Sequence, residues 1–167
     1  EVKPAGVTSS REEVEHMLKI VYDEVLRATH SSCGSIRLLD RKPGSRSRVT
    51  ASIGEEAGRS LPAIEKAAMQ SGEVVLMTDA RSGEYEPAHD GVLSELVVPI
   101  IRQNAAAGVI HLHAAEADRY DEIAVDIARS LAAQTALSLD ALDGARERVE
   151  KDEILLRRSS AISRLFA

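Results

Sequence analysis

The segment Ser94–His113, SELVVPIIRQNAAAGVIHLH, decides the fold of this chain. It contains two runs rich in Val, Ile and Leu, at 96–101 and 109–112, separated by polar and small residues that end at Gly108. This pattern predicts two antiparallel strands joined by a turn. Pro99 has no backbone N–H, so we expect it at a sheet edge or a bulge, where no ladder hydrogen bond is lost.

The second run divides its side chains between two different environments. Successive residues of a strand point to opposite faces of the sheet. Val109, His111 and His113 therefore share one face, and Ile110 and Leu112 share the other. We infer that the sheet buries its apolar face against helices and that its mixed face has another use.

Several motifs, taken in order, resemble the GAF domain family. The family pattern has an apolar strand ending in Val-Pro-Leu, then an Ile-Gly-Val-Leu strand, then a helix of the type Leu-Leu-x-x-Leu-Ala-x-Gln. The corresponding segments here are Gly34–Asp40 in the first strand, Val98–Ile100, Gly108–Ile110 and Leu131–Gln134. The resemblance covers roughly residues 10 to 145. It implies an α/β (α+β) fold, with a GAF/PAS-like central antiparallel sheet and the N- and C-terminal helices packed on one face.

Composition narrows the class of protein. The chain has 167 residues and a formal net charge of -6, which argues against a nucleic-acid partner. The single cysteine, Cys33, excludes a disulfide within the chain and suits the cytoplasm. No apolar run approaches the roughly 18 residues of a membrane span, so we expect no membrane partner. Because the sequence begins with Glu1 rather than Met, we expect it to be a fragment of a longer protein.

Local signals place the first elements. Capping-box patterns at Ser9 and Ser10 predict a helix that starts there and ends near Thr29. Strands are expected at 33–40, 48–53 and 73–77, and a short helix between Pro62 and Gly72. The apolar stripe expected on the first helix consists of Val14, Leu18, Val21 and Val25.

The last helix is predicted to begin at Tyr120–Asp121 and to run to about Ser159. We expect 1–8 to be a lead-in, 9–145 the GAF domain and 146–167 a C-terminal signalling helix that links to an effector. The expected apolar face of the helix is Ile123, Ile127, Leu131 and Leu137. Residues spaced seven apart predict a coiled-coil seam and hence a homodimer through the N- and C-terminal helices: Leu142, Val149 and Leu156.

Candidate ligand contacts follow partly from the resemblance, which implies that Ser35 and His111 face a pocket. Arg37 shares the face of Ser35 by the two-residue period, and its partner would be an anionic ligand, Glu95 or Asp79. The alternative is an exposed arginine. Residues 78–94 are predicted to form a pocket lid, or else a plain solvated connection. The predicted ligand-binding set is Ser35, Arg37, Asp79, Tyr85, Glu95 and His111.

We predict no catalytic residue, metal or cofactor. His111 and His113 are too few ligands for a metal site. One cysteine does not match the GAF branch that reduces free methionine sulfoxide, and the Asn-Lys-Phe-Asp-Glu motif of cyclic-nucleotide-binding members is missing. The resemblance implies a cytoplasmic small-molecule-sensing and dimerisation module of a signalling protein, such as a sensor histidine kinase, with a small anionic metabolite as ligand. The alternatives are a purely structural dimerisation domain and a haem or redox sensor.

Overall fold

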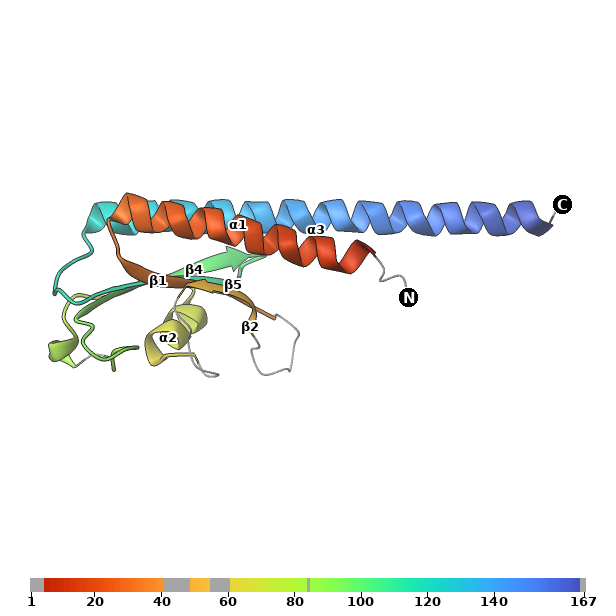
Figure 1. Ribbon diagram of the computed structural model, residues 1–167. Helices are drawn as coiled ribbons and strands as arrows, with labels where there is room; N and C mark the ends of the chain where they lie inside the picture. Colours follow the sequence, from red (N-terminus) through yellow and green to blue (C-terminus); the bar gives the residue numbers. More distant parts are fainter. Residues whose placement is uncertain (1–4, 41–48, 55–60, 84, 166–167) are drawn as a thin grey trace.

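The computed structural model describes residues 5–40, 49–54, 61–83 and 85–165 (Figure 1). Five strands form one antiparallel sheet in the order β2-β1-β5-β4-β3, which confirms the predicted fold class. No described helix has the length and apolar character needed to cross a bilayer. In chain order the elements are α1 (Ala5–Thr29), β1 (Cys33–Leu39), β2 (Val49–Gly54), α2 (Ala63–Ser71), β3 (Val75–Met77), the 3-10 helix η1 (Ala80–Ser82), β4 (Ser94–Arg102), β5 (Ala105–Ala114) and α3 (Glu122–Leu165).

The sheet lies between two helical layers (Figure 1). The long helices α1 and α3 run side by side over one face, and α2 covers the other. Ile110 and Leu112 are fully buried in the core beneath the long helices. His111 therefore faces α2, as the alternation along β5 predicts.

The β4–β5 hairpin is tighter than expected. Its turn consists of Gln103 and Asn104 alone, with φ of 49° and 61°. Two left-handed residues match the right-handed twist of the flanking strands, so Ala105 and the following small residues pair within β5 instead of looping out. Pro99 lies as expected, because β3 pairs with β4 only as far as Val97 and the register shifts after Ile100.

The predicted apolar face of α3 is only partly correct: Leu131 packs against the core and Ile127 is half-buried. Ile123 and Leu137 are 68% and 70% exposed. Small side chains make up most of the buried face of α3, and Ile123 and Leu137 point outward. The buried face is instead made by Ala124, Ala128, Ala132, Ala136 and Leu139.

The other helix limits follow local chemistry, with one exception. α1 begins at Ala5, so Ser9 lies inside the helix and does not cap it. α2 starts after Pro62 and stops at Gly72, whose φ of 69° is the left-handed C-terminal cap. Asp121 accepts a hydrogen bond from the Ala124 N–H at 2.8 Å and caps α3, which continues to Leu165.

Gly34 on β1 allows a close approach of β5. A Cβ at this position would lie 2.6 Å from the carbonyl oxygen of His111 and 2.9 Å from Leu112 Cδ2. We expect Gly34→Ala to lower the free energy of unfolding by about 2 kcal/mol, because the central strand pair must separate. Urea denaturation measures this loss, and Gly144→Ala in α3 is a useful comparison because that Cβ would meet nothing within 4 Å. Equal stability of Gly34→Ala and the unmodified chain would contradict the close packing.

Candidate functional site

Charged side chains gather between the sheet and α2. Ser35 and His111 are cross-strand neighbours on β1 and β5, and Glu95 on β4 is paired with His113. Arg37 lies two residues beyond Ser35, on the same face of β1. Glu65 enters from α2, and all of these side chains are buried.

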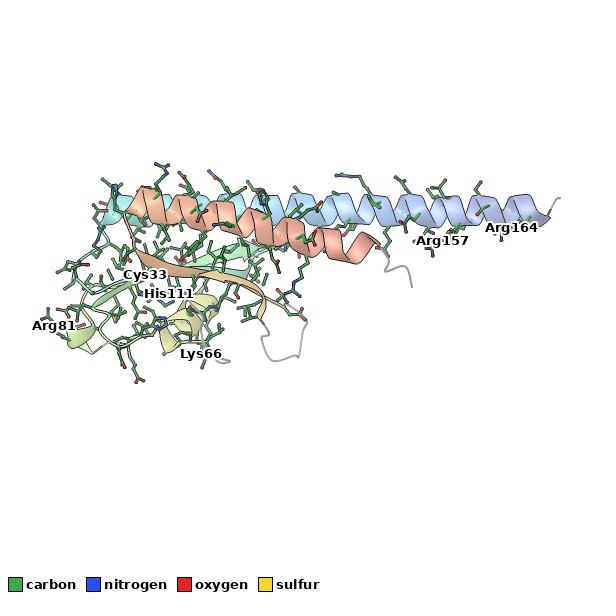
Figure 2. All side chains as sticks on the ribbon, viewed as in Figure 1. Cys33, Lys66, Arg81, His111, Arg157 and Arg164 are labelled. Atoms are coloured by element: carbon green, nitrogen blue, oxygen red, sulfur yellow. The ribbon has the colours of Figure 1, made fainter. Side chains whose placement is uncertain are left out.

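His111 is the centre of this group. Its Nδ1 lies 2.7 Å from Glu65 Oε1, and its Nε2 lies 2.8 Å from Glu95 Oε1. Figure 2 shows His111 between the sheet and α2. Arg37 Nη2 lies 2.9 Å from Glu65 Oε1 and donates to Ser35 Oγ at 3.3 Å. We refer to Arg37, Glu65, Glu95 and His111 as the charged cluster.

The contacts of His111 determine its charge. A neutral imidazole has one N–H donor, whereas both ring nitrogens of His111 face a carboxylate oxygen, which suits an imidazolium. Burial alone would lower the pKa of His111, but the hydrogen bonds and negative charges of Glu65 and Glu95 outweigh it and raise that pKa. Burial lowers the pKa of Arg37, against the charge of Glu65, yet arginine stays protonated in proteins. The cluster then holds two positive and two negative charges.

The hydrogen bonding of the charged cluster is incomplete. Within the part of the chain that the structure describes, Arg37 Nη1 and Glu65 Oε2 are buried and have no hydrogen-bond partner. Each such group costs about 1–3 kcal/mol when it is left unsatisfied. Unsatisfied buried polar atoms are rare in native proteins, so these two mark a place where a further polar group would be stabilising.

The structure brings together four of the six predicted residues: Ser35, Arg37, Glu95 and His111. The predicted partners of Arg37 within the chain were wrong, because Glu65 takes that place. We missed Glu65 because it belongs to no motif. The available signal was its position three and four residues before Ala68 and Met69, on the buried side of α2.

Asp79 lies outside the charged cluster. It caps η1, where it accepts from the Arg81 N–H at 3.0 Å and pairs with Arg81 Nη2 at 2.6 Å. These hydrogen bonds from Arg81 hold the pKa of Asp79 at about 2. In Figure 2, Arg81 lies at the left edge of the molecule, apart from His111.

The segment 78–94 contacts the cluster through its backbone. The Ala88 N–H lies 3.4 Å from both carboxylate oxygens of Glu95. Tyr85 does not join the charged groups but packs against an apolar cluster that includes Ile64 and Met77. This apolar cluster fixes α2 against the sheet and so holds Glu65 in place.

α2 lies over the mixed face of the sheet. Three cavities lined by described residues border the long helices. One of about 390 Å³ lies beside Pro99 and Arg129, and one of about 590 Å³ beside Arg102 and Arg146. A third, of about 430 Å³, is a groove between α1 and α3 that includes Ile123.

Stability should depend on pH through His111. Its pKa is higher in the fold than the value of about 6.5 in an unfolded chain. The stabilising charge is therefore fully present below about pH 6.5 and is lost as the pH rises through the folded-state pKa. We expect the free energy of unfolding to fall by up to about 1.4 kcal/mol per pH unit in that window.

Urea titrations at several pH values measure this slope. The groups around the His111 ring are Arg37, Glu65, Glu95 and His113, whose ring centroid lies 5.8 Å from that of His111. His111→Gln should remove the slope. Replacing the exposed His16 with Gln should keep it, and a slope that survives His111→Gln would show that another group titrates.

Comparison with known families supplies a match over most of the chain. A family model described as "GAF domain" matches residues 11–140. A search of curated proteins found no match to this sequence.

Solved structures share the fold at low sequence identity. Free methionine-R-sulfoxide reductase of Thermoplasma acidophilum superposes with a TM-score of 0.63 at 17% identity, over 76% of this chain and 92% of that one. The GAF domain of an Acinetobacter phosphoenolpyruvate-protein phosphotransferase superposes with a TM-score of 0.61 at 18% identity, and the match covers 85% of this chain and 97% of that one. A GAF domain/HD domain protein from Geobacter sulfurreducens superposes with a TM-score of 0.63 at 14% identity, and the match covers 81% of this chain and 97% of that one.

Proposed function

This chain belongs to the GAF domain family, and we propose that it is the small-molecule-sensing and dimerisation module of a cytoplasmic signal-transduction protein, such as a sensor histidine kinase or another regulator. The observation that carries the proposal is the charged cluster, in which two buried charged atoms lack a partner among the described residues. A ligand that supplies those partners would stabilise one arrangement of α2 over the sheet. Such a ligand acts only through its different affinity for the two arrangements.

β4 connects the cluster to the long helices. Glu95 lies near one end of β4, and Arg102 is the last residue at the other. Arg102 Nε lies 2.8 Å from Asp140 Oδ1, and Arg102 Nη2 lies 2.7 Å from Asp143 Oδ2. Both aspartates belong to α3. We infer that a shift of β4 at Glu95 is transmitted to α3 through Arg102.

The outer surface of the long helices supports dimerisation. Every described side chain from Ala145 to Ile162 is exposed, and Figure 2 shows Arg157 and Arg164 on this extended part of α3. Large apolar side chains that are more than half exposed extend along α1 and α3: Ile20, Ile123, Leu137, Val149, Leu155, Leu156 and Ile162. An exposed apolar stripe of this length favours a second copy of the chain as its cover.

The spacing of this stripe fits a paired helix. Ile123 and Leu137 lie two heptads apart, and Leu155 and Ile162 lie one heptad apart. Leu137 and Leu155 are separated by five full turns of an α-helix. These four residues therefore follow one line along α3, and the groove of about 430 Å³ beside Ile123 belongs to the same surface.

We do not propose enzymatic activity. The Thermoplasma acidophilum protein is a reductase, but the single thiol here, Cys33, has no second cysteine in the chain with which to form a disulfide. A haem sensor using His111 is also disfavoured, because both ring nitrogens contact carboxylates and one contact would have to break. The remaining alternative is a structural GAF domain that dimerises without a ligand.

A thermal-shift screen with a metabolite library tests the sensing function. Under the proposal, at least one compound raises the melting temperature by an amount that grows with its concentration. The same compound should slow backbone hydrogen exchange in α2 and alter it in α3 near Asp140. A library without such a compound would contradict sensing and favour the structural domain.

The proposed coupling through Arg102 predicts a separate effect. Arg102→Gln should lower stability by only about 1 kcal/mol or less, because Asp140 and Asp143 are about half exposed. Backbone hydrogen exchange in α3 around these aspartates should nevertheless become faster. Arg129→Gln, at an exposed position of α3, is the matched control. Unchanged exchange in Arg102→Gln would contradict a mechanical link.

A further inference from the structure

The two unsatisfied atoms of the charged cluster belong to one ion pair. Arg37 Nη2 contacts Glu65 Oε1, which leaves Nη1 of the same guanidinium and Oε2 of the same carboxylate buried without a partner among described residues. The first atom is an N–H donor and the second an acceptor. A single molecule that satisfies both must present an acceptor to Arg37 and a donor to Glu65.

The other polar groups of the site are already engaged. His111 uses both ring nitrogens, and the carboxylate of Glu95 faces His111 and the Ala88 N–H. Ser35 Oγ accepts from Arg37. The free hydrogen-bonding capacity of the site is therefore concentrated at the Arg37–Glu65 pair, which makes this pair the contact point for a guest.

The charge of the cluster restricts the guest further. Arg37 and an imidazolium His111 balance Glu65 and Glu95, so the four groups sum to zero. An anionic guest would leave one uncompensated negative charge in a buried site, and a cationic guest one positive charge. A net-neutral guest keeps the balance.

We propose that the site binds a small net-neutral molecule that gives an acceptor to Arg37 and a donor to Glu65. This chemistry occurs in an ammonium–carboxylate zwitterion and in an uncharged primary amide. The inference rests on the proposed sensing function and replaces the anionic metabolite expected from sequence. Because α2 covers the cluster, entry of the guest requires α2 to move away from the sheet.

Matched compounds separate the charge classes. For each of several side chains, the set contains four compounds. The free amino acid and the N-acetyl amino acid amide are net neutral. The N-acetyl amino acid is anionic, and the amino acid amide is cationic. Calorimetry and thermal shift with the full 167-residue chain at about pH 6.5 measure their binding. We expect a neutral member to bind at least about tenfold more tightly than its charged analogues. Comparing the affinity of the free amino acid with that of the N-acetyl amino acid amide shows whether the site prefers the zwitterion or the uncharged amide.

Variants locate the binding. Glu65→Gln should abolish binding of the neutral compound, whereas Glu73→Gln, just after α2 and exposed, should leave it unchanged. The charge ranking is measured in the unmodified chain, so it holds even if Glu65→Gln does not fold.

The outcomes distinguish this inference from the sensing function. Tighter binding of an anionic or cationic member overturns the neutral-ligand class and leaves sensing intact. A charged library compound that binds while every member of the set fails has the same meaning, whereas a net-neutral one supports the neutral-ligand class. Neutral binding that survives in folded Glu65→Gln overturns the assigned site. Failure of the set and of the whole library overturns both proposals.

Discussion

Glu65→Ala is expected to lower the free energy of unfolding by about 3–5 kcal/mol, the usual cost of removing one partner from a buried ion pair. Glu65 contacts Arg37 and His111 with the same oxygen, so its loss leaves Arg37 without its carboxylate and His111 with Glu95 alone. Its side chain is fully buried, so water does not replace the lost contacts. Chemical denaturation at pH 6.5 and at higher pH measures the effect, which should be largest at the lower pH because His111 is then charged.

Two comparisons make this result specific. Glu73→Ala removes an exposed carboxylate just beyond α2 and should change stability by less than about 0.5 kcal/mol. The double variant Arg37→Met with Glu65→Met removes the pair together and should recover part of the loss, because no buried charge of that pair is left unpaired. A loss below about 1 kcal/mol in Glu65→Ala would show that the cluster does not hold the fold together.

The double variant Ile123→Glu with Leu137→Glu is expected to convert the chain from dimer to monomer. Both side chains are at least 68% exposed in the single chain, so the substitutions should leave the fold intact. In a dimer they would place carboxylates in an apolar seam, where burying an unpaired charge is costly. We expect the dissociation constant to rise by about a hundredfold or more, which is the effect of roughly 3 kcal/mol.

Light scattering across a concentration series measures the mass in solution. The control places the same two charges on α2, which covers the other face of the sheet, with Ala63→Glu and Gln70→Glu at exposed positions. This control should remain dimeric. A monomeric unmodified chain, or a dimer that persists in Ile123→Glu with Leu137→Glu, would contradict pairing through the surface of α3.

Local patterns predicted the parts of the fold that local chemistry controls. The alternation from Val109 to His113 gave the correct faces of β5, and Gly72 ended α2. Pro99 marked the end of the β3 pairing with β4. In each case the decisive interaction involves residues close in sequence or the two faces of one strand.

The remaining features depend on contacts between distant segments. Ile123 and Leu137 looked like core residues because they are apolar, but α1 and the sheet lie close enough to α3 that alanines fill the interface. Glu65 looked like an ordinary surface residue until Arg37 and His111 were placed beneath it. The partner of a buried charge becomes visible only when the sheet and α2 are assembled.

Nuclear magnetic resonance of the His111 side chain in ¹⁵N-labelled protein at pH 7 tests the central claim most directly. The two short contacts to Glu65 and Glu95 predict an imidazolium, with both ring nitrogens still protonated at a pH where an exposed histidine has lost its charge. Signals of one protonated and one unprotonated nitrogen at pH 7 would contradict the account, because the charged cluster would then carry a net negative charge.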